Sequence, residues 1–341
     1  MDPLSQGTVG VAFAQSVANK NNILKIGFIG FLAGMAPDLD VLIQSSTDPI
    51  LSLEYHRQFT HSLFFIPIGA LICAILIFPF FKSSLSLKTV YFASFLGYAT
   101  HGLLDACTSY GTQLFWPFSN ERISWNNISI VDPLFTIPTL IFLVITIKTK
   151  NKIFSFFGIG WIIFYLTLGY IQYERALSAA LELAAIRGHN AERMTLKPSF
   201  GNLILWKSIY QHNETFYVDA IRTAQSSSWC LGETISVFDY NSHLPDLDMK
   251  SQQKKDIERF RWFSQDYLGY NKEKNIVTDV RYSMIPNQIN PMWGLTIDEQ
   301  SGINDHATWW TSRNLDQSQI DLFINMLKGK KCICKPFKFL S

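Results

Sequence analysis

The sequence has few charged residues for its length. Only 16% of its 341 residues are Asp, Glu, Lys or Arg, against roughly 25% in a typical soluble protein. Hydrophobic residues make up 48% of the chain and aromatic residues 14%, which excludes an intrinsically disordered protein. The 29 basic and 27 acidic side chains leave a formal net charge of +2. Nucleic-acid binding driven by bulk positive charge is therefore excluded as well.

The charged residues are unevenly distributed along the chain. Residues 1–171 hold 17 of them, about 10% of that stretch, whereas the remaining 170 residues hold 39, about 23%. The first part has the composition of a membrane protein and the second that of a soluble domain. We predict a multi-pass α-helical membrane bundle at residues 1–171 that carries the functional site. A small α+β, mainly antiparallel, extracytoplasmic domain follows at residues 172–341, with a linking helix at residues 172–190.

Long apolar runs support the membrane assignment. A bilayer-spanning helix needs about 20 apolar residues, because its backbone polar groups must be satisfied without water. The sequence therefore predicts four to five spans, at residues 62–81, 90–108, 131–147 and 153–171, with a shorter fifth candidate at 23–35. The chain start lacks the charged segment and cleavage site of a removable signal peptide. We expect an uncleaved helix to serve as the targeting signal.

Lysine residues indicate how this bundle is oriented. They fall in three alternate loops of the predicted bundle, whereas the opposite loops carry Arg57 and Arg122. Because basic residues in short loops prefer the cytoplasmic side, residues 36–61, 109–130 and the part after residue 171 are expected outside the cytoplasm. The lysines concerned are Lys20, Lys25, Lys82, Lys88, Lys148, Lys150 and Lys152.

Several ionisable residues lie in or beside the apolar runs. Such a residue inside a span costs at least about 2.5 kcal/mol and is a functional-site hypothesis by default. His101 and Asp105 are four residues apart and share one helix face. An Asp-x-Asp follows the first apolar run, and two histidines precede the second. All map to the outer face: Asp38, Asp40, His56, His61, His101 and Asp105.

Imidazole and carboxylate groups without a thiolate are typical of a Zn²⁺, Mn²⁺ or Fe²⁺ site, and Zn²⁺ is the ion we expect first. The set suffices for one ion with carboxylates that orient the imidazoles, or for two ions bridged by an Asp. Taken singly, each pair has a structural explanation, as a helix cap, an interfacial loop or a buried hydrogen-bonded pair. Their coincidence at one face favours the metal site.

These residues resemble the YdjM-like family of bacterial membrane-bound, metal-dependent hydrolases. The resemblance covers about the first 150 residues, with the order and spacing of the motifs preserved. It implies packed helices with metal ligands at all six His and Asp residues named above. The motifs are DPL at 2–4, MAPDLD at 35–40, HRQFTHS at 56–62, HGLLDACTSYGTQLFWPF at 101–118 and SIVDPLF at 129–135.

One position departs from the family pattern. Members often carry a His just after the DPL start, where this chain has Gln6. An amide oxygen binds a transition metal more weakly than an imidazole, so the resemblance implies a depleted site with one ion where relatives hold two. Asp132 is a further possible ligand or substrate-orienting group. Because Pro133 follows it, a helix N-cap explains it equally well.

The expected function is hydrolysis of a phospholipid or related lipid phosphoester at the outer face of the bacterial inner (plasma) membrane. A metal-activated water attacks, and Asp40 or Asp105 takes the proton. Arg57 and Arg122 either clamp an anionic head group or anchor their loops at the interface. The alternatives are a cation- or proton-linked transporter, or a scaffold with a structural metal and a partner-binding outer domain. We expect membrane lipid as substrate or environment and no nucleic acid; the sequence names no protein partner.

The second part of the sequence predicts strands at residues 202–211, 214–224, 275–284 and 292–299, because β-branched and aromatic residues alternate there between polar turns. Residues 248–263 predict a surface helix. In an oxidising compartment, Cys230 is expected to form a disulfide with Cys332 or Cys334.

Overall fold

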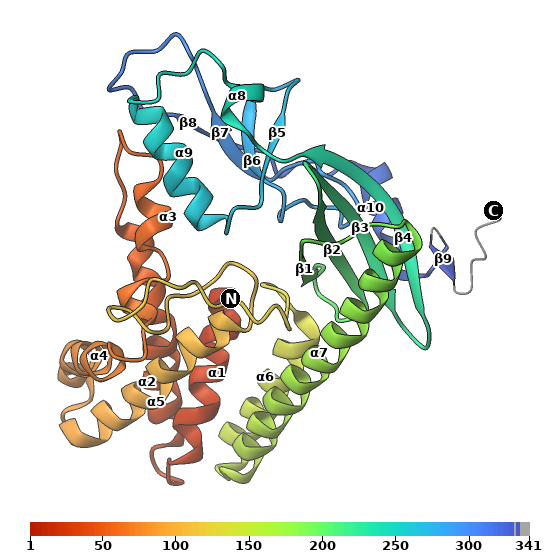
Figure 1. Cartoon of the computed structure of the whole chain (residues 1–341). Helices are drawn as coiled ribbons and strands as arrows, with labels where there is room; N and C mark the ends of the chain where they lie inside the picture. Colours follow the sequence, from red (N-terminus) through yellow and green to blue (C-terminus); the bar gives the residue numbers. More distant parts are fainter. Residues whose placement is uncertain (331, 335–341) are drawn as a thin grey trace. The chain divides into compact units, whose positions relative to one another are not determined.

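The computed structural model describes residues 1–330 and 332–334, and they form two compact units. The first unit comprises Met1–Ile43, Tyr55–Ile171 and Phe200–Asn202; the second comprises Gln44–Glu54, Gln172–Ser199 and the described residues from Leu203 onward. Helix α7 (Ile153–Ile186) passes from the first unit into the second after Ile171 (Figure 1). The segment Gln44–Glu54 belongs to the second unit, although both of its flanks belong to the first.

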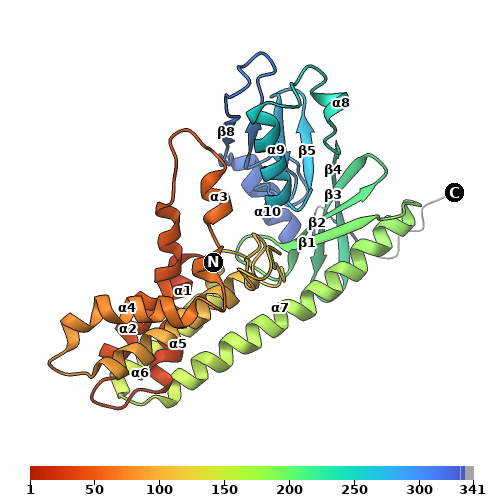
Figure 2. The same cartoon turned by 60° about the vertical axis from the view of Figure 1, so that its left-hand side comes forward.

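The first unit is helical (Figure 2). Its elements are α1 (Pro3–Ser16), α2 (Ile23–Met35), the 3-10 turns η1 (Ala36–Leu42) and η2 (Phe59–His61), α4 (Ile66–Phe81), α5 (Leu87–Ala106), α6 (Pro133–Thr149) and the first part of α7; the short α3 (Leu51–Tyr55) crosses the boundary between the units. Helix α1 was missed by the sequence analysis. Its start has a clear local cause, because Asp2 accepts a hydrogen bond from the Ser5 backbone N–H and Pro3 occupies the first helical position.

Small residues let α1, α2 and α5 pack closely. Gly30 of α2 lies between Gly10 of α1 and Gly97 of α5, and a Cβ on either of those two glycines would collide with the Gly30 carbonyl oxygen. Small residues at helix interfaces of this kind allow backbones to approach within van der Waals contact. The close packing fixes the ends of α2 and α5, which carry the candidate site.

The predicted count of four to five spans is wrong. Within the described residues, α7 is the one helix that is long and apolar enough to cross a membrane, with a second span only if Leu51–His61 and Ile66–Phe81 form one element bent by 88°. Helices α2, α4 and α6 have 13, 16 and 17 residues. At 1.5 Å per residue they extend roughly 20 to 26 Å, short of a bilayer core about 30 Å thick. Helix α5 has 20 residues but includes Lys88, His101 and Asp105.

The helical unit nevertheless exposes a large apolar surface. One side of α4 is made of aliphatic and aromatic side chains that are between 46% and 81% exposed, namely Ile68, Leu71, Ile72, Ile75, Leu76 and Phe80. Soluble proteins rarely expose contiguous apolar patches of this kind. The surface suits contact with lipid rather than with water.

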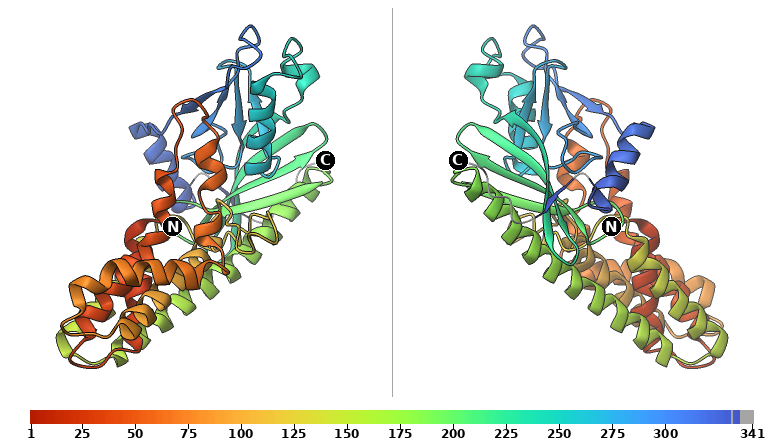
Figure 3. Two further views of the ribbon diagram at one scale, coloured as in Figure 1. Left: turned by 90° about the vertical axis from the view of Figure 1, so that its left-hand side faces the viewer. Right: turned by 90° about the vertical axis from the view of Figure 1, so that its right-hand side faces the viewer.

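The second unit contains two antiparallel sheets in its described part (Figure 3). One has the order β1-β2-β3-β4-β9 and the other β5-β6-β7-β8. The strands are β1 (Arg193–Pro198), β2 (Leu205–His212), β3 (Thr215–Thr223), β4 (Ser227–Ser236), β5 (Leu268–Asn271), β6 (Ile276–Asp279), β7 (Trp293–Thr296), β8 (Thr308–Thr311) and β9 (Ile333–Cys334). The antiparallel strands expected for this part of the chain are present.

Helices complete the second unit. They are α8 (Tyr240–His243), α9 (Gln252–Phe263), which corresponds to the expected surface helix, and α10 (Gln317–Leu327). The linking helix is the continuation of α7, which packs its last turns against Trp206, Ile221 and Trp229 of the larger sheet. A disulfide joins Cys230 to Cys332, which is one of the two pairings that the sequence leaves open.

Two lysines are buried next to each other in the larger sheet. Lys197 on β1 pairs with Lys207 on β2, and the two residues are 5% and 4% exposed. The Lys207 Nζ donates hydrogen bonds to the Ser283 hydroxyl at 2.8 Å and the Gln288 carbonyl at 2.9 Å. Burial lowers the pKa of the Lys207 ammonium to about 7 and that of Lys197 well below its usual range. Both side chains thus lose protons more readily in the folded state.

We predict that the second unit becomes more stable as pH rises from 7 to 9. Over this window the unfolded state keeps the Lys207 proton while the folded state loses it, which contributes roughly 2 kcal/mol to the rise in the free energy of unfolding; Lys197 adds to it in the same direction. Below pH 7 both states hold the proton and the penalty stays constant. Urea unfolding of the full chain at several pH values, followed by tryptophan fluorescence, measures this. Lys207→Met should reduce the rise by roughly 2 kcal/mol and leave the part that comes from Lys197, whereas Lys255→Met, at an exposed position, should leave the whole rise. An unchanged rise in Lys207→Met would contradict the assignment.

Candidate metal centre

Four of the predicted ligands meet at one point in the helical unit. Asp38 lies on η1, directly after α2; His61 ends η2; His101 and Asp105 lie one turn apart near the end of α5. One donor atom from each lies within 4.8 Å of the donor atoms of the other three. The chain thus brings together residues from three segments that are up to 67 positions apart in sequence.

The donor atoms lie close enough together to share one metal ion. The His61 Nε2 lies 3.0 Å from the His101 Nε2. The Asp38 Oδ1 lies 3.5 Å and 3.3 Å from these two nitrogens, and the Asp105 Oδ2 lies 3.3 Å and 3.8 Å from them. Zn²⁺ ligands at about 2.0 to 2.1 Å from the ion would be separated from one another by about 3.3 Å. The five separations, between 3.0 and 3.8 Å, are close to this value, and the set of donors suits a divalent transition metal.

Hydrogen bonds orient both imidazoles toward this point. The His101 Nδ1 lies 2.6 Å from the Gly34 carbonyl oxygen, so it carries the proton and leaves Nε2 as the donor atom for a metal. The His61 Nδ1 lies 3.2 Å from Asp40 and 2.9 Å from the Thr60 hydroxyl. A Cβ on Gly102 would collide with the His61 carbonyl oxygen. A glycine at this position allows η2 to lie against α5.

Asp40 accepts hydrogen bonds from three neighbouring groups. Its carboxylate accepts hydrogen bonds from the His56 Nδ1 at 2.7 Å, the Arg57 backbone N–H at 3.1 Å and the Thr60 hydroxyl at 2.8 Å. It thereby orients His56 and His61 together. Asp38, Asp40 and His56 also have donor atoms within 4.8 Å of one another, which makes a second group of metal-ligand type beside the first.

The three histidines of the site differ in their exposure to solvent. The side chains of His61 and His101 are fully buried, whereas that of His56 is 34% exposed. Asp38 is 22% exposed and is the most accessible member of the four-residue cluster. Solvent therefore reaches the site on the side of Asp38 and His56.

The two carboxyls on η1 stay ionised. Burial opposes the charged form of Asp38, but the imidazoles of His101 and His61 beside it outweigh burial and hold the pKa of Asp38 well below its usual range. For Asp40, hydrogen bonds from His56 and His61 outweigh burial in the same way and lower the pKa. Carboxylates that remain charged when buried are suitable metal ligands.

Asp105 is surrounded by positive and hydrogen-bonding groups. The Arg57 Nε lies 3.0 Å from its Oδ2, and the Gln6 side-chain N–H donates to its Oδ1 at 2.8 Å. The α-amino group of Met1 also contacts Oδ1. Gln6 is buried, and among the described residues its Oε1 has no hydrogen-bond partner. The position that departs from the family pattern thus lies beside a carboxylate of the cluster.

The remaining predicted residues have other contacts. Arg57 is 3% exposed, and its guanidinium also donates to the Thr108 hydroxyl at 2.9 Å. Arg122 is buried and donates to the Gly111 carbonyl oxygen at 3.0 Å. Asp132 caps α6 by accepting from the Leu134 backbone N–H, and the Tyr165 hydroxyl also donates to it. Asp132 therefore has the N-cap geometry that its Pro neighbour suggested.

Two groups that orient the site residues were not identified from the sequence. Thr60 lies between the two histidines of HRQFTHS and bonds both Asp40 and His61; its place inside the motif was a usable signal. The Gly34 oxygen that orients His101 is a backbone atom. No residue type encodes a backbone acceptor, so no sequence pattern could have found it.

Comparison with known proteins gives the family. The chain matches the model of the family described as YdjM inner membrane protein over residues 1–176, which confirms the resemblance noted from the motifs. It is also similar to inner membrane protein YbcI of Escherichia coli (strain K12), with 33% identity over 97 residues, 28% of this chain and 55% of that protein. The match thus spans about half the length of this curated relative, and none of the solved structures matches the chain. Because the family model covers more than half of the sequence, the chain belongs to the YdjM family of inner membrane proteins.

Proposed function

We propose that this protein is a membrane-associated, metal-dependent hydrolase. The observation that carries the proposal is the convergence of donor atoms from Asp38, His61, His101 and Asp105 on one point. Two imidazoles and two carboxylates suit Zn²⁺ best, with Mn²⁺ or Fe²⁺ as alternatives of similar ligand preference. A bound ion of this kind polarises a phosphoryl oxygen and lowers the pKa of a coordinated water.

The surrounding residues hold the ligands ready for this chemistry. Arg57 offsets the charge of Asp105, and the Gly34 carbonyl and Asp40 fix the rings of His101 and His61. Such partners set the protonation and orientation of the ligating side chains. Asp38 is the ligand nearest to solvent, so a substrate would approach from its side.

His56 is placed to accept a proton. Its Nδ1 is held by Asp40, which leaves Nε2 as the basic atom, and its side chain reaches solvent. An imidazole oriented by a carboxylate is a common general base. We therefore assign proton acceptance to His56 and an orienting role to Asp40, in place of the direct proton transfer to Asp40 or Asp105 considered from the sequence.

A lipid phosphoester is the substrate class that this setting favours. The family is one of inner membrane proteins, and the exposed apolar side of α4 suits contact with acyl chains. The lysines just before α7, the helix that is long and apolar enough to span, favour the cytoplasmic side for its start and support a site on the outer side of the membrane. Arg57 and Arg122 are buried on protein groups, so neither is assigned to the substrate head group.

One observation favours a second candidate function. Four protein donors are enough to fill the coordination of a tetrahedral ion, and structural zinc sites are closed in this way, whereas catalytic sites keep one position for water. A scaffold held together by a structural metal ion would have the same cluster. The enzyme requires Asp38, the most exposed ligand, to share its position with water or substrate.

The metal content of variants tests the centre itself. We expect detergent-purified full-length protein to contain stoichiometric transition metal by mass spectrometry. His61→Ala and His101→Ala should lose most of it, because each removes one of four ligands. His212→Ala, a histidine of the second unit outside the cluster, should retain it. Wild-type protein without bound metal, or ligand variants that retain all of it, would refute the site.

Activity of a metal-loaded variant separates enzyme from scaffold. We expect His56→Ala to keep its metal but to hydrolyse a phospholipid or a lipid phosphomonoester about 10² times more slowly, the usual contribution of a general base. His212→Ala should have wild-type activity. A fully metal-loaded wild-type protein that cleaves no lipid phosphoester would instead support the scaffold.

A further inference from the structure

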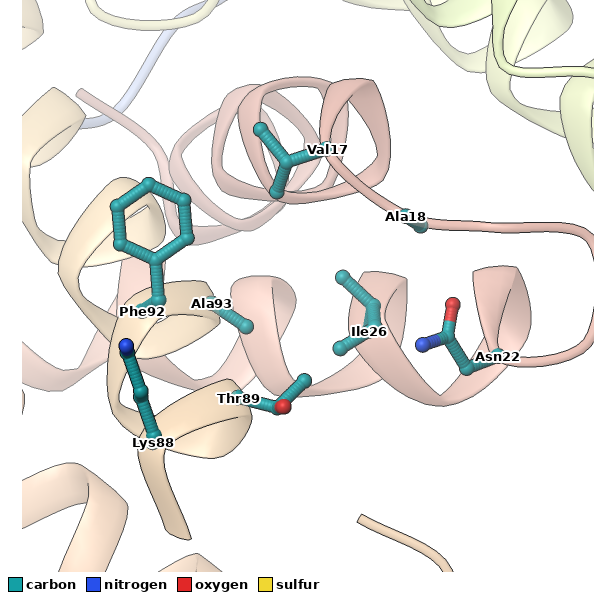
Figure 4. A pocket seen from close by; sticks show the side chains of 8 residues that line it. All are labelled: Val17, Ala18, Asn22, Ile26, Lys88, Thr89, Phe92 and Ala93. Atoms are coloured by element: carbon teal, nitrogen blue, oxygen red, sulfur yellow. The ribbon is translucent and has the colours of Figure 1, made fainter. Parts of the chain in front are cut away.

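We propose that the helical unit binds an anionic phospholipid at the end opposite to the metal-ligand cluster. A cavity of about 220 Å³ opens there between the turn that joins α1 to α2 and the first turns of α5 (Figure 4). On α5, Lys88 at the cavity and His101 at the cluster are 13 residues apart, or about 20 Å along the helix. The two sites are therefore separate, and this proposal does not depend on the proposed hydrolase.

The cavity is lined by apolar residues on one side and by polar groups on the other. Ile26 and Ala93 are buried and form an apolar wall, while Val17 and Phe92 are 47% and 50% exposed and border the opening. Polar groups come from Lys88, Asn22 and Thr89, and Figure 4 shows the Lys88 amine and the Asn22 amide at the margin of the cavity. An apolar wall beside an amine, an amide and a hydroxyl suits an amphiphile better than a free ion.

The charge around this cavity is positive throughout. All seven lysines of the helical unit lie in or next to the turns α1–α2, α4–α5 and α6–α7, and the sequence has no acidic residue at 17–25, 82–88 or 148–152. Figure 3 shows these three turns at one end of the unit. Helices α2, α5 and α7 also begin there, so their partial positive N-terminal charges add to those of the lysines. An anionic head group is the complement of this end.

Phosphate alone would leave part of the site unused. Lys88, Thr89 and Asn22 can bind a phosphate group, but Val17 and Phe92 would still be exposed to water. An acyl chain attached to the same phosphate would cover them, because removal of apolar area from water contributes about 25 cal/mol per Å². Basic sites between membrane helices commonly bind acidic lipids for these reasons.

Lipid binding by the full-length protein tests the proposal. We would measure the affinity of detergent-purified protein for short-chain phosphatidylglycerol, short-chain phosphatidylcholine and inorganic phosphate by native mass spectrometry and by thermal shift. Phosphatidylglycerol should bind more tightly than the other two. Lys88→Gln should weaken its binding about fivefold, the effect of about one basic residue near an anionic lipid. Val17→Trp should block the cavity without changing charge and weaken binding as well.

Lys82→Gln is the matched control, because it removes a lysine of the same turn that does not line the cavity. It should leave phosphatidylglycerol affinity within about a factor of two. Equal weakening in Lys82→Gln and Lys88→Gln would show bulk electrostatic attraction and refute the site. Binding of phosphatidylcholine as tight as that of phosphatidylglycerol, or of inorganic phosphate as tight as that of the lipid, would also refute it. Both lysines are exposed, so loss of folding is not expected in either variant.

Discussion

The approach of two imidazole nitrogens and two carboxylate oxygens to one point is the constraint around which the helical unit is organised. Helix α2 has to end at Met35, so that η1 can place Asp38 at the cluster and the Gly34 carbonyl can accept from His101. Helix α5 has to lie close enough to η2 for His61 to meet His101, which the absence of a side chain at Gly102 permits. The close packing of α1, α2 and α5 through glycine serves the same geometry.

This constraint competes with the requirements of a membrane helix. Helix α5 has the length of a span, but it carries polar side chains in its last turns, where an isolated apolar helix would have none. The apolar run at residues 62–81 is likewise not one straight helix, because η2 ends at His61 and α4 begins at Ile66. The number of spans was predicted from the length of apolar runs in the sequence. Such runs do not show where a helix ends to place site residues, so the predicted number was too high.

The local parts of the structure could be predicted from the sequence, and the long-range parts could not. The i, i+4 spacing of His101 and Asp105 and the motifs around Asp38 and His61 pointed to residues that the fold does bring together. Helix α1 has a local start signal that could have been used. In contrast, the segment Gln44–Glu54 belongs to the second unit because Arg259 binds Asp48 and Glu54. Partners more than 200 residues apart have no shared sequence pattern.

The direction of α5 relates the two proposed sites of the helical unit. A helix carries partial positive charge at its first residues and partial negative charge at its last. An anionic lipid beside Lys88 and a cation beside Asp105 both match this polarity. Asp105 lies in the last turn of α5, where the negative end of the helix dipole disfavours a carboxylate. Arg57 and the α-amino group of Met1 both offset this charge. A metal ion at the cluster would also balance the charges of Asp38 and Asp40, which fits the proposed role of these buried residues as ligands and as partners of ligands.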